Sequence, residues 1–244
     1  MSRQSRFLTA EWKNLVMLNY AVDPRLLQRY VPVSTELDAF EGKTYVSLVG
    51  FEFNRIRVLG LPIPWHRSFE EVNLRFYVRR GSKRGVVFIS ELVPKRAVAA
   101  VARLAFNEKY SYVPMSHRVE VRADGETVEA EYRWGAAAQQ CRMWIETEGP
   151  GSIAPEGSAS QFITEHYWGY AAQADGGCME YEVQHPQWQV RGAKTAGYSG
   201  ELAGYYGAEM AKELAREPDS AFLAEGSAVT VYQGIRMDNA HSSR

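Results

Sequence analysis

The run Val93-Pro94-Lys95-Arg96 places a primary amine beside a guanidinium at the predicted start of a helix. Pro94 suits a first helical turn, because its missing N–H would have no intrahelical partner there. The helix dipole disfavours a cation at Lys95 by about 0.3–1 kcal/mol, and so favours the neutral, nucleophilic amine. The alternative is that Lys95 and Arg96 are simply solvated at an exposed helix start.

Two carboxylates and an arginine lie on nearby runs that are typical of strands. Glu52 lies between Phe51 and Phe53, so on a strand its side chain points away from both rings. Either it is buried beside a partner, or it faces solvent while the rings enter the core, and the sequence leaves both open. Glu71 directly precedes an alternating strand, where a barrel would place the mouth of a pocket. Arg75, within that strand, either binds a carboxylate bidentately, from a substrate or from Glu71, or points outward.

The histidines show no metal-ligand spacing, and no HxH or HExxH pattern occurs among them: His66, His117, His166, His185 and His241. We therefore expect no metal and no other cofactor. GxGxxG, GxxxxGK[ST] and GxSxG motifs are also missing, so nucleotide binding and α/β-hydrolase chemistry have no support. His166 lies on a predicted helix, where it either lines a pocket or is a hydrogen-bonded core histidine.

The bulk composition indicates a globular protein. The 244 residues carry a net charge of −1, which argues against nucleic acid and against anionic membranes as partners. The most apolar run is too short to span a bilayer, and the first residues lack the apolar segment of a signal peptide. Cys141 and Cys178 form no CxxC pair and are expected to be inert thiols in a reducing cytoplasm. A homo-oligomer remains compatible with this composition.

The predicted elements are mostly strands, joined by turn signals and several hairpins. We expect strands at 12–22, 36–40, 43–58, 72–80, 86–93, 117–133 (a hairpin), 139–147, 179–190 and 228–237. Four helices are expected, starting at Asp23-Pro24, at Pro94, at Ser158 (to Ala172) and at Glu201 (to Arg216). This pattern predicts a β-rich α+β fold: a barrel or cone of mostly antiparallel strands flanked by helices. One domain should span 1–237, followed by a polar tail at 238–244.

Several short motifs, taken together, resemble one family. They are Asp23-Pro24 with Val31-Pro32, the run 69–75 (FEEVNLR), the run 93–97 (VPKRA), the run 162–168 (FITEHYW) and the run 185–188 (HPQW). In order and spacing, from about Trp12 to Met237, the chain resembles the YqjF-like family, domain of unknown function 2071. That family is similar in fold to acetoacetate decarboxylase.

The resemblance implies a barrel-like core around a small-molecule pocket. It also implies Lys95 as a Schiff-base nucleophile, Arg96 as its neighbouring cation, and Glu52 and Glu71 as the carboxylates near the amine. The decarboxylase has Pro-Lys-Lys where this chain has Pro-Lys-Arg, which weakens the correspondence.

The aromatic residues of the motif stretches are expected to line the pocket: Phe51, Phe53, Trp65, Phe76 and Trp168. Arg75, His166, Trp65 and Phe76 are the predicted substrate contacts. The preferred interpretation is a protein that binds a small carbonyl or carboxylate compound. The alternative is a Schiff-base decarboxylase or lyase that acts on a small keto acid through Lys95. A shared fold alone does not decide between them.

Overall fold

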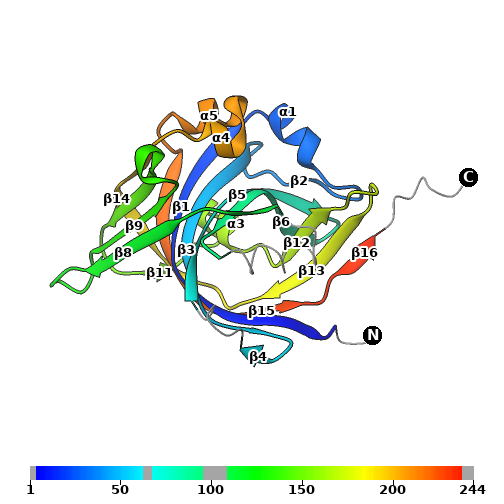
Figure 1. Ribbon diagram of the computed structural model, residues 1–244, viewed down its shortest axis with the longest axis horizontal. Coiled ribbons are helices and arrows are strands. Elements are labelled where there is room, and N and C mark those ends of the chain that lie inside the picture. Colours follow the sequence, from blue (N-terminus) through cyan, green and yellow to red (C-terminus); the bar gives the residue numbers. More distant parts are fainter. Residues whose placement is uncertain (1–3, 63–67, 96–108, 238–244) are drawn as a thin grey trace, which may run out of the picture.

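The strands of this protein form one sheet that closes on itself. The computed structural model describes residues 4–62, 68–95 and 109–237, and within them 16 strands pair into one continuous sheet. Strand β13 pairs with β12 on one side and with β15 on the other, so the neighbouring strands form a ring (Figure 1). The ring strands, in spatial order, are β13 (Cys178–Gln184), β12 (Trp168–Ala172), β6 (Lys83–Val93), β5 (Ser68–Arg80), β3 (Thr44–Val58), β1 (Arg6–Val22) and β15 (Ser220–Tyr232).

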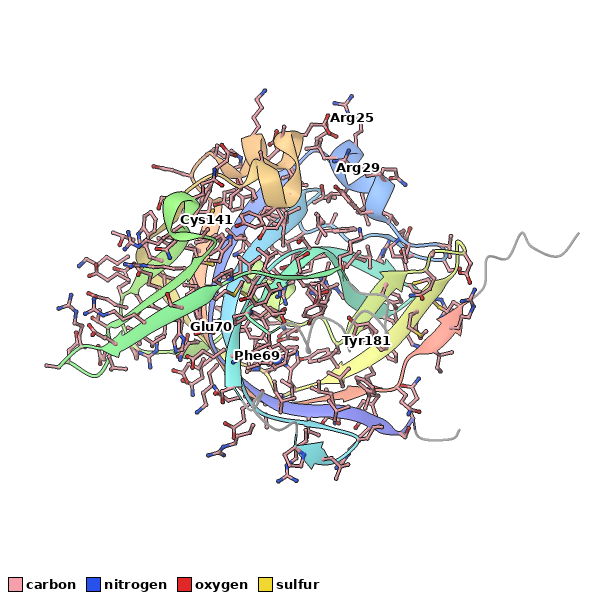
Figure 2. The ribbon with its side chains drawn as sticks, viewed as in Figure 1. Arg25, Arg29, Phe69, Glu70, Cys141 and Tyr181 are labelled. Carbon is pink, nitrogen blue, oxygen red and sulfur yellow. The ribbon has the colours of Figure 1, made fainter. Side chains whose placement is uncertain are left out.

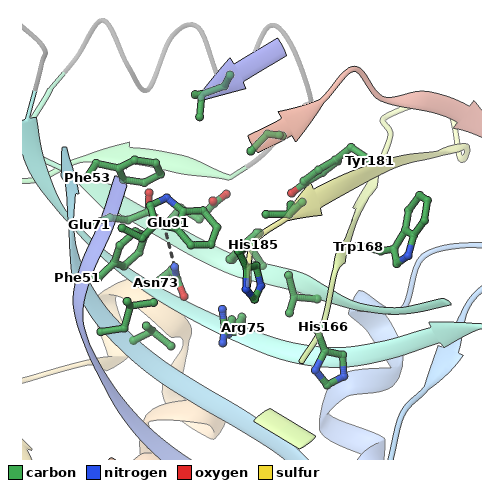
Figure 3. Close-up of a pocket in the computed structure, with 18 of the residues that line it drawn as sticks. Phe51, Phe53, Glu71, Asn73, Arg75, Glu91, His166, Trp168, Tyr181 and His185 are labelled. Carbon is green, nitrogen blue, oxygen red and sulfur yellow. Dashed lines mark hydrogen bonds between the residues drawn. The ribbon is translucent and has the colours of Figure 1, made fainter. Parts of the chain in front are cut away.

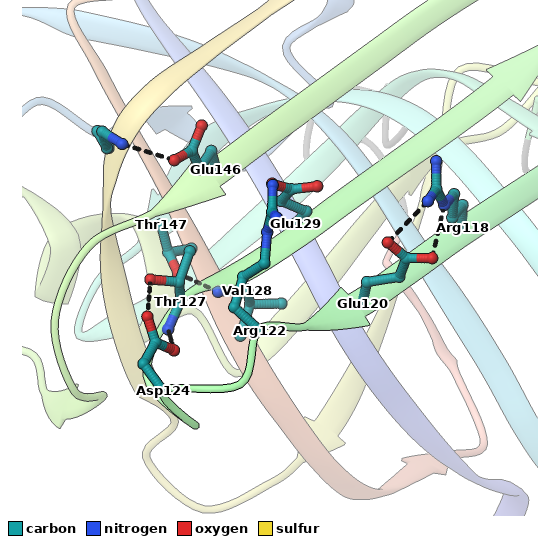
Figure 4. A network of polar contacts seen from close by, with 10 residues as sticks. Arg118, Glu120, Arg122, Asp124, Thr127, Val128, Glu129, Glu146 and Thr147 are labelled. Carbon is teal, nitrogen blue, oxygen red and sulfur yellow. Dashed lines mark hydrogen bonds and ion pairs between the residues drawn. The ribbon is translucent and has the colours of Figure 1, made fainter.

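A second part of the sheet extends from β15 as a wing at the left of Figure 1. Its strands are β14 (Gln189–Ser199), β10 (Cys141–Thr147), β9 (Val128–Trp134) and β8 (Met115–Val121). Polar contacts cover its surface and the β8–β9 turn, where Asp124 accepts backbone hydrogen bonds from Glu126 and Thr127 at 2.9 and 2.8 Å (Figure 4). The exposed Arg118–Glu120 pair, 2.7 Å apart, contributes little to stability because water screens it.

Short elements complete the fold. The short strands are β2 (Glu36–Leu37), β4 (Leu61–Pro62), β7 (Tyr110–Tyr112), β11 (Ser152–Ile153) and β16 (Ile235–Met237). The helices are α1 (Pro24–Leu27), α3 (Ala159–Thr164), α4 (Ala203–Tyr206) and α5 (Ala208–Leu214), with 3-10 turns at Gln28–Tyr30 and Ala137–Gln139. Arg25 and Arg29 extend from α1 and the turn after it on the outside of the molecule (Figure 2).

Both faces of β5 are buried along most of the strand. Val72, Leu74 and Phe76 pack into the core beneath the helices, which includes Met210 and Leu214 of α5. The alternate residues of β5 point into the ring, because successive side chains of a strand lie on opposite faces. The alternation of apolar and polar residues in the predicted strand 72–80 is typical of a strand with one face in solvent. In the structure its polar residues Asn73 and Arg75 instead face the interior of the ring.

The expected β-rich fold of mostly antiparallel strands is confirmed, while four predicted elements are corrected. The predicted strand 228–237 is divided between the end of β15 and β16, with a break at residues 233 and 234. The predicted helix 158–172 ends at Thr164, because residues 168–172 pair with β13 across the turn at Gly176. The predicted helix 201–216 is broken at Gly207, whose φ of 84° is not helical. The predicted strand 179–190 is two strands separated at Pro186.

Other expectations are confirmed or fall outside the described residues. The Asp23 carboxylate caps α1 by accepting the N–H of Arg25 at 2.9 Å, and Ser158 caps α3 by accepting that of Gln161 at 3.2 Å. The predicted helix after Pro94 and the tail 238–244 lie outside the described residues. In the described part of the chain no helix combines the length and hydrophobicity needed to cross a bilayer.

Candidate ligand-binding site

The interior of the ring holds a pocket with a volume of about 140 Å³. Residues 69, 71, 73 and 75 of β5 line one side, as the two-residue period of a strand requires. Phe51 and Phe53 of β3 line the adjacent side, and Trp168, Tyr181 and His185 lie opposite (Figure 3). Sixteen strands thus provide a rigid frame in which side chains from distant parts of the sequence meet.

Of the two predicted site carboxylates, Glu71 lines the pocket. Its side chain accepts a hydrogen bond from Asn73 Nδ2 at 2.9 Å and another from the Tyr110 hydroxyl at 3.1 Å. Burial raises the pKa of Glu71 to about 7, although both hydrogen bonds and the nearby charge of Arg75 act in the opposite direction. Near neutral pH this carboxyl is therefore partly protonated.

Arg75 is the cation of the pocket. Only 8% of its surface is exposed, and among the described residues its guanidinium forms no ion pair. One Nη donates to the Ile163 carbonyl at 3.4 Å, and Nε is buried without a described hydrogen-bond partner. Because no described carboxylate pairs directly with this buried guanidinium, its N–H donors remain open to an anionic ligand.

Two histidines contribute imidazoles to the pocket that are neutral at pH 7. Burial lowers the pKa of His166 to about 4, despite its 3.3 Å contact from Nε2 to Asp38 Oδ2. Asp38 also accepts a hydrogen bond from Arg84 Nε at 2.7 Å. Burial likewise lowers the pKa of His185 to about 4, and its ring stacks on Trp188 with centroids 4.2 Å apart. Neutral rings leave Arg75 as the positive charge of the lining.

Glu91 enters the pocket because of a bulge in β6. Leu74 pairs with Ser90 and Arg75 with Phe88, so Ile89 is an extra residue on β6. Beyond the bulge, the residues of β6 that face the pocket shift by one position. Phe88 and Glu91, three residues apart, therefore both line the pocket. Glu91 is 2% exposed and brings a second carboxyl into the site.

The structure places Glu52 and Phe76, two of the predicted site residues, outside the lining of this pocket. Glu52 lies on the opposite face of β3, where it accepts a hydrogen bond from Asn14 at 2.7 Å and lies 3.4 Å from His117 Nε2. Phe76 faces the core beneath the helices, since its neighbour Arg75 faces the pocket. A strand cannot direct two consecutive side chains into one cavity without a bulge.

The other predicted residues divide into three groups. Arg75, Glu71 and His166 lie together in the pocket, as do Phe51, Phe53 and Trp168 of the expected aromatic lining. Lys95 is half-buried and does not belong to the described lining. Arg96 and Trp65 lie outside the described residues.

Sequence reasoning missed Asn73, Glu91 and Tyr110. The alternation that includes Glu71 and Arg75 could have identified Asn73, whereas nothing in the sequence reveals the bulge that turns Glu91 inward. Among the described residues there is no group of three His, Cys, Asp or Glu side chains that could hold a metal ion.

Comparison with known proteins identifies the family. The model of the DUF2071 family, described as an uncharacterized conserved protein, matches residues 9–228. The chain belongs to this family. The uncharacterized protein YqjF of Bacillus subtilis (strain 168) is 34% identical over 105 residues, a match that spans 43% of each protein. This DUF2071 chain therefore aligns with less than half of the length of that curated relative.

Solved structures confirm the acetoacetate-decarboxylase-like fold of this DUF2071 protein. The enduracididine biosynthesis enzyme MppR, complexed with pyruvate, superposes with a TM-score of 0.70 at 10% identity, covering 98% of this chain and 93% of that one. Acetoacetate decarboxylase from Legionella pneumophila subsp. pneumophila str. Philadelphia 1 gives 0.66 at 11% identity, covering 98% and 91%. An acetoacetate decarboxylase-like enzyme from Sphingomonas wittichii RW1 gives 0.66 at 11%, covering 96% and 94%. At these identities the likeness concerns the fold alone.

Proposed function

We propose that this protein binds a small carboxylate compound, such as a 2-oxo acid, inside the ring, with Arg75 as the receptor for the carboxylate. The observation that carries the proposal is the buried guanidinium of Arg75, which faces the pocket and has no ion-pair partner among the described residues. A planar guanidinium binds a carboxylate through two parallel hydrogen bonds.

The surroundings of Arg75 support an anionic ligand that also carries a carbonyl or hydroxyl group. His166 and His185 are neutral, and Glu71 with a pKa of about 7 is partly protonated at neutral pH. A protonated Glu71 can donate a hydrogen bond to a carbonyl oxygen, and an ionised Glu71 can accept one from a hydroxyl. The pyruvate in the MppR complex is a compound of this class.

Calorimetric titration with pyruvate tests the proposal. Arg75→Gln should weaken binding by about tenfold or more, because a hydrogen bond to a charged group contributes about 1.5–3 kcal/mol. Arg79→Gln is the matched control: Arg79 lies on the same strand but is exposed, with an ion pair to Glu36 at 3.0 Å. Equal affinities of Arg75→Gln and wild type would contradict the role of Arg75.

A second candidate is a Schiff-base lyase that acts through Lys95. The observation that favours it is the position of Lys95, which is half-buried and follows β6, the strand that carries Glu91 into the pocket. Borohydride added with acetoacetate should then trap an imine on Lys95, and Lys95→Arg should abolish the adduct. An unlabelled wild-type protein, or equal labelling of several surface lysines, would contradict the lyase function and leave ligand binding as the remaining candidate.

A further inference from the structure

The two sides of the pocket differ in chemistry. A cluster of polar groups comes from β5, the end of β6 and β7: Glu71, Asn73, Arg75, Glu91 and Tyr110. The imidazoles of His166 and His185 line the pocket elsewhere. The neighbouring side, from β1, β3 and the residue before β14, is aromatic. There Trp12 contacts Phe51, Phe53 and Trp188 edge to face, with ring centroids 5.5, 5.7 and 6.1 Å apart. These four residues, which all line the pocket, are the aromatic wall.

The pocket is also larger than a three-carbon acid requires. A water molecule needs about 10–15 Å³ of such a cavity, so the 140 Å³ present hold on the order of ten water-sized groups. A carboxylate bound at Arg75 with an adjacent carbonyl would fill only the polar side. Water left against the aromatic wall finds few hydrogen-bond partners, the indole N–H of Trp12 being one, so its displacement by an apolar group favours binding.

We propose that the ligand of this protein carries an apolar group about as large as a phenyl ring, which lies against the aromatic wall while the carboxylate pairs with Arg75. This inference rests on the proposed function and specifies its substrate class: an aryl- or bulky alkyl-substituted small acid. The aromatic wall supplies ring edges and faces for such a group, and ring contacts of this kind add to the effect of burial.

Three probes of related shape test the inference by calorimetry: pyruvate, phenylpyruvate, and phenylacetone, in which a methyl group replaces the carboxylate of phenylpyruvate. Phenylpyruvate should bind about tenfold or more tightly than pyruvate, because it buries a ring that pyruvate lacks. Phenylacetone should bind more weakly than phenylpyruvate, because it lacks the carboxylate that would form the charge-assisted, bidentate contact with Arg75.

A variant that fills the apolar side provides a second test. Leu8→Trp adds bulk at a half-buried residue that lines the pocket, so the larger ring has some room to fit. It should reduce the affinity for phenylpyruvate about tenfold or more and leave that for pyruvate nearly unchanged. Val121→Trp is the control, because Val121 is 63% exposed on β8 and lies away from the pocket. Circular dichroism checks that each variant is folded.

The outcomes separate this inference from the proposed function. If pyruvate binds through Arg75 but the phenyl group brings no gain, the inference is overturned and the proposed function stands. If phenylacetone binds as tightly as phenylpyruvate, the carboxylate receptor is wrong although the aromatic wall binds rings. If none of the three probes binds to the wild-type protein, both proposals are contradicted.

Discussion

Glu71 and Arg75 lie four residues apart on the same face of β5, yet the hydrogen bonds to the Glu71 carboxylate come from Asn73 and Tyr110. The charge of Arg75 acts to lower the pKa of Glu71, but among the described residues no ion pair joins the two side chains. The acid and the cation of the pocket therefore both keep binding capacity for a ligand, and their charges are coupled.

The first prediction concerns the pH dependence of stability. The folded-state pKa of Glu71, about 7, lies above the ordinary value of 4.5 for a glutamate side chain, so the folded protein holds this proton more tightly than the unfolded chain does. The contribution of this raised pKa to the free energy of unfolding is fully present below about pH 4.5. It is lost as the pH rises toward 7, by at most about 1.4 kcal/mol per pH unit. Glu71→Gln should therefore gain stability relative to wild type between pH 4.5 and pH 7.5. Urea unfolding across this range measures the difference, and a difference that is constant with pH contradicts the prediction.

The second prediction concerns the pH dependence of binding. Above about pH 7, Glu71 ionises and its negative charge competes with a bound carboxylate for Arg75. The affinity for pyruvate should fall between pH 6 and pH 8 in the wild type and change much less in Glu71→Gln. Glu70→Gln is the matched control, because Glu70 directly precedes Glu71 on β5 but contacts His117 at 2.8 Å on the other face. The prediction fails if Glu71→Gln retains the wild-type pH profile.

The third prediction concerns His166. Burial lowers the pKa of its imidazole to about 4, and the positive charge of Arg84 acts in the same direction. Arg84→Met should raise the pKa of His166, because it removes that cation and leaves the Asp38 carboxylate to the imidazole. An NMR titration of the histidine ring protons measures the change. Arg80→Met, which removes a cation paired with Glu180 at 3.2 Å, should leave the pKa of His166 in place.

The fourth prediction concerns a glycine behind the pocket. A Cβ at Gly169 would lie 2.1 Å from the ring of Tyr181, which lines the pocket from the paired strand. Gly169→Ala should destabilise the protein by about 1–3 kcal/mol, because the ring must move. It should also alter ligand affinity. A Cβ at Gly192 on β14 would meet no atom within 4 Å, so Gly192→Ala should change the midpoint of thermal unfolding little. Equal midpoints for the two variants would show that the close approach of the Tyr181 ring to Gly169 does not limit stability.

How much the sequence predicts is clear from the strands around the pocket. Alternation along β5 implies the shared face of Glu71 and Arg75 that the structure shows, and the same rule excludes Phe76 from that face, although Phe76 was a predicted substrate contact. For Glu52 the rule gave the relation to Phe51 and Phe53 but not which side is the interior. That choice depends on where the ring closes, which is a tertiary property.

The remaining differences have local physical causes that a single sequence does not reveal. Glu91 lines the pocket only because Ile89 is an extra residue in β6. The expected helix at 158–172 is shortened because residues 168–172 gain partners in β13, a pairing that overrides the helical spacing of Phe162, Ile163 and Tyr167. Such pairings are decided by the whole sheet.

The pairing of β1 with β15 also has a consequence for biosynthesis. Thr9, near the start of the chain, pairs with Thr230, and Val183 and Val231 close the ring. While the chain emerges from the ribosome, β1, β3 and β5 can pair with one another, but the apolar surfaces they will bury inside the ring stay uncovered until β15 is released. The nascent chain is therefore exposed to aggregation until β15 has been made, and folding governed by such distant contacts is slow. Ligand binding becomes possible only once β15 has joined the ring.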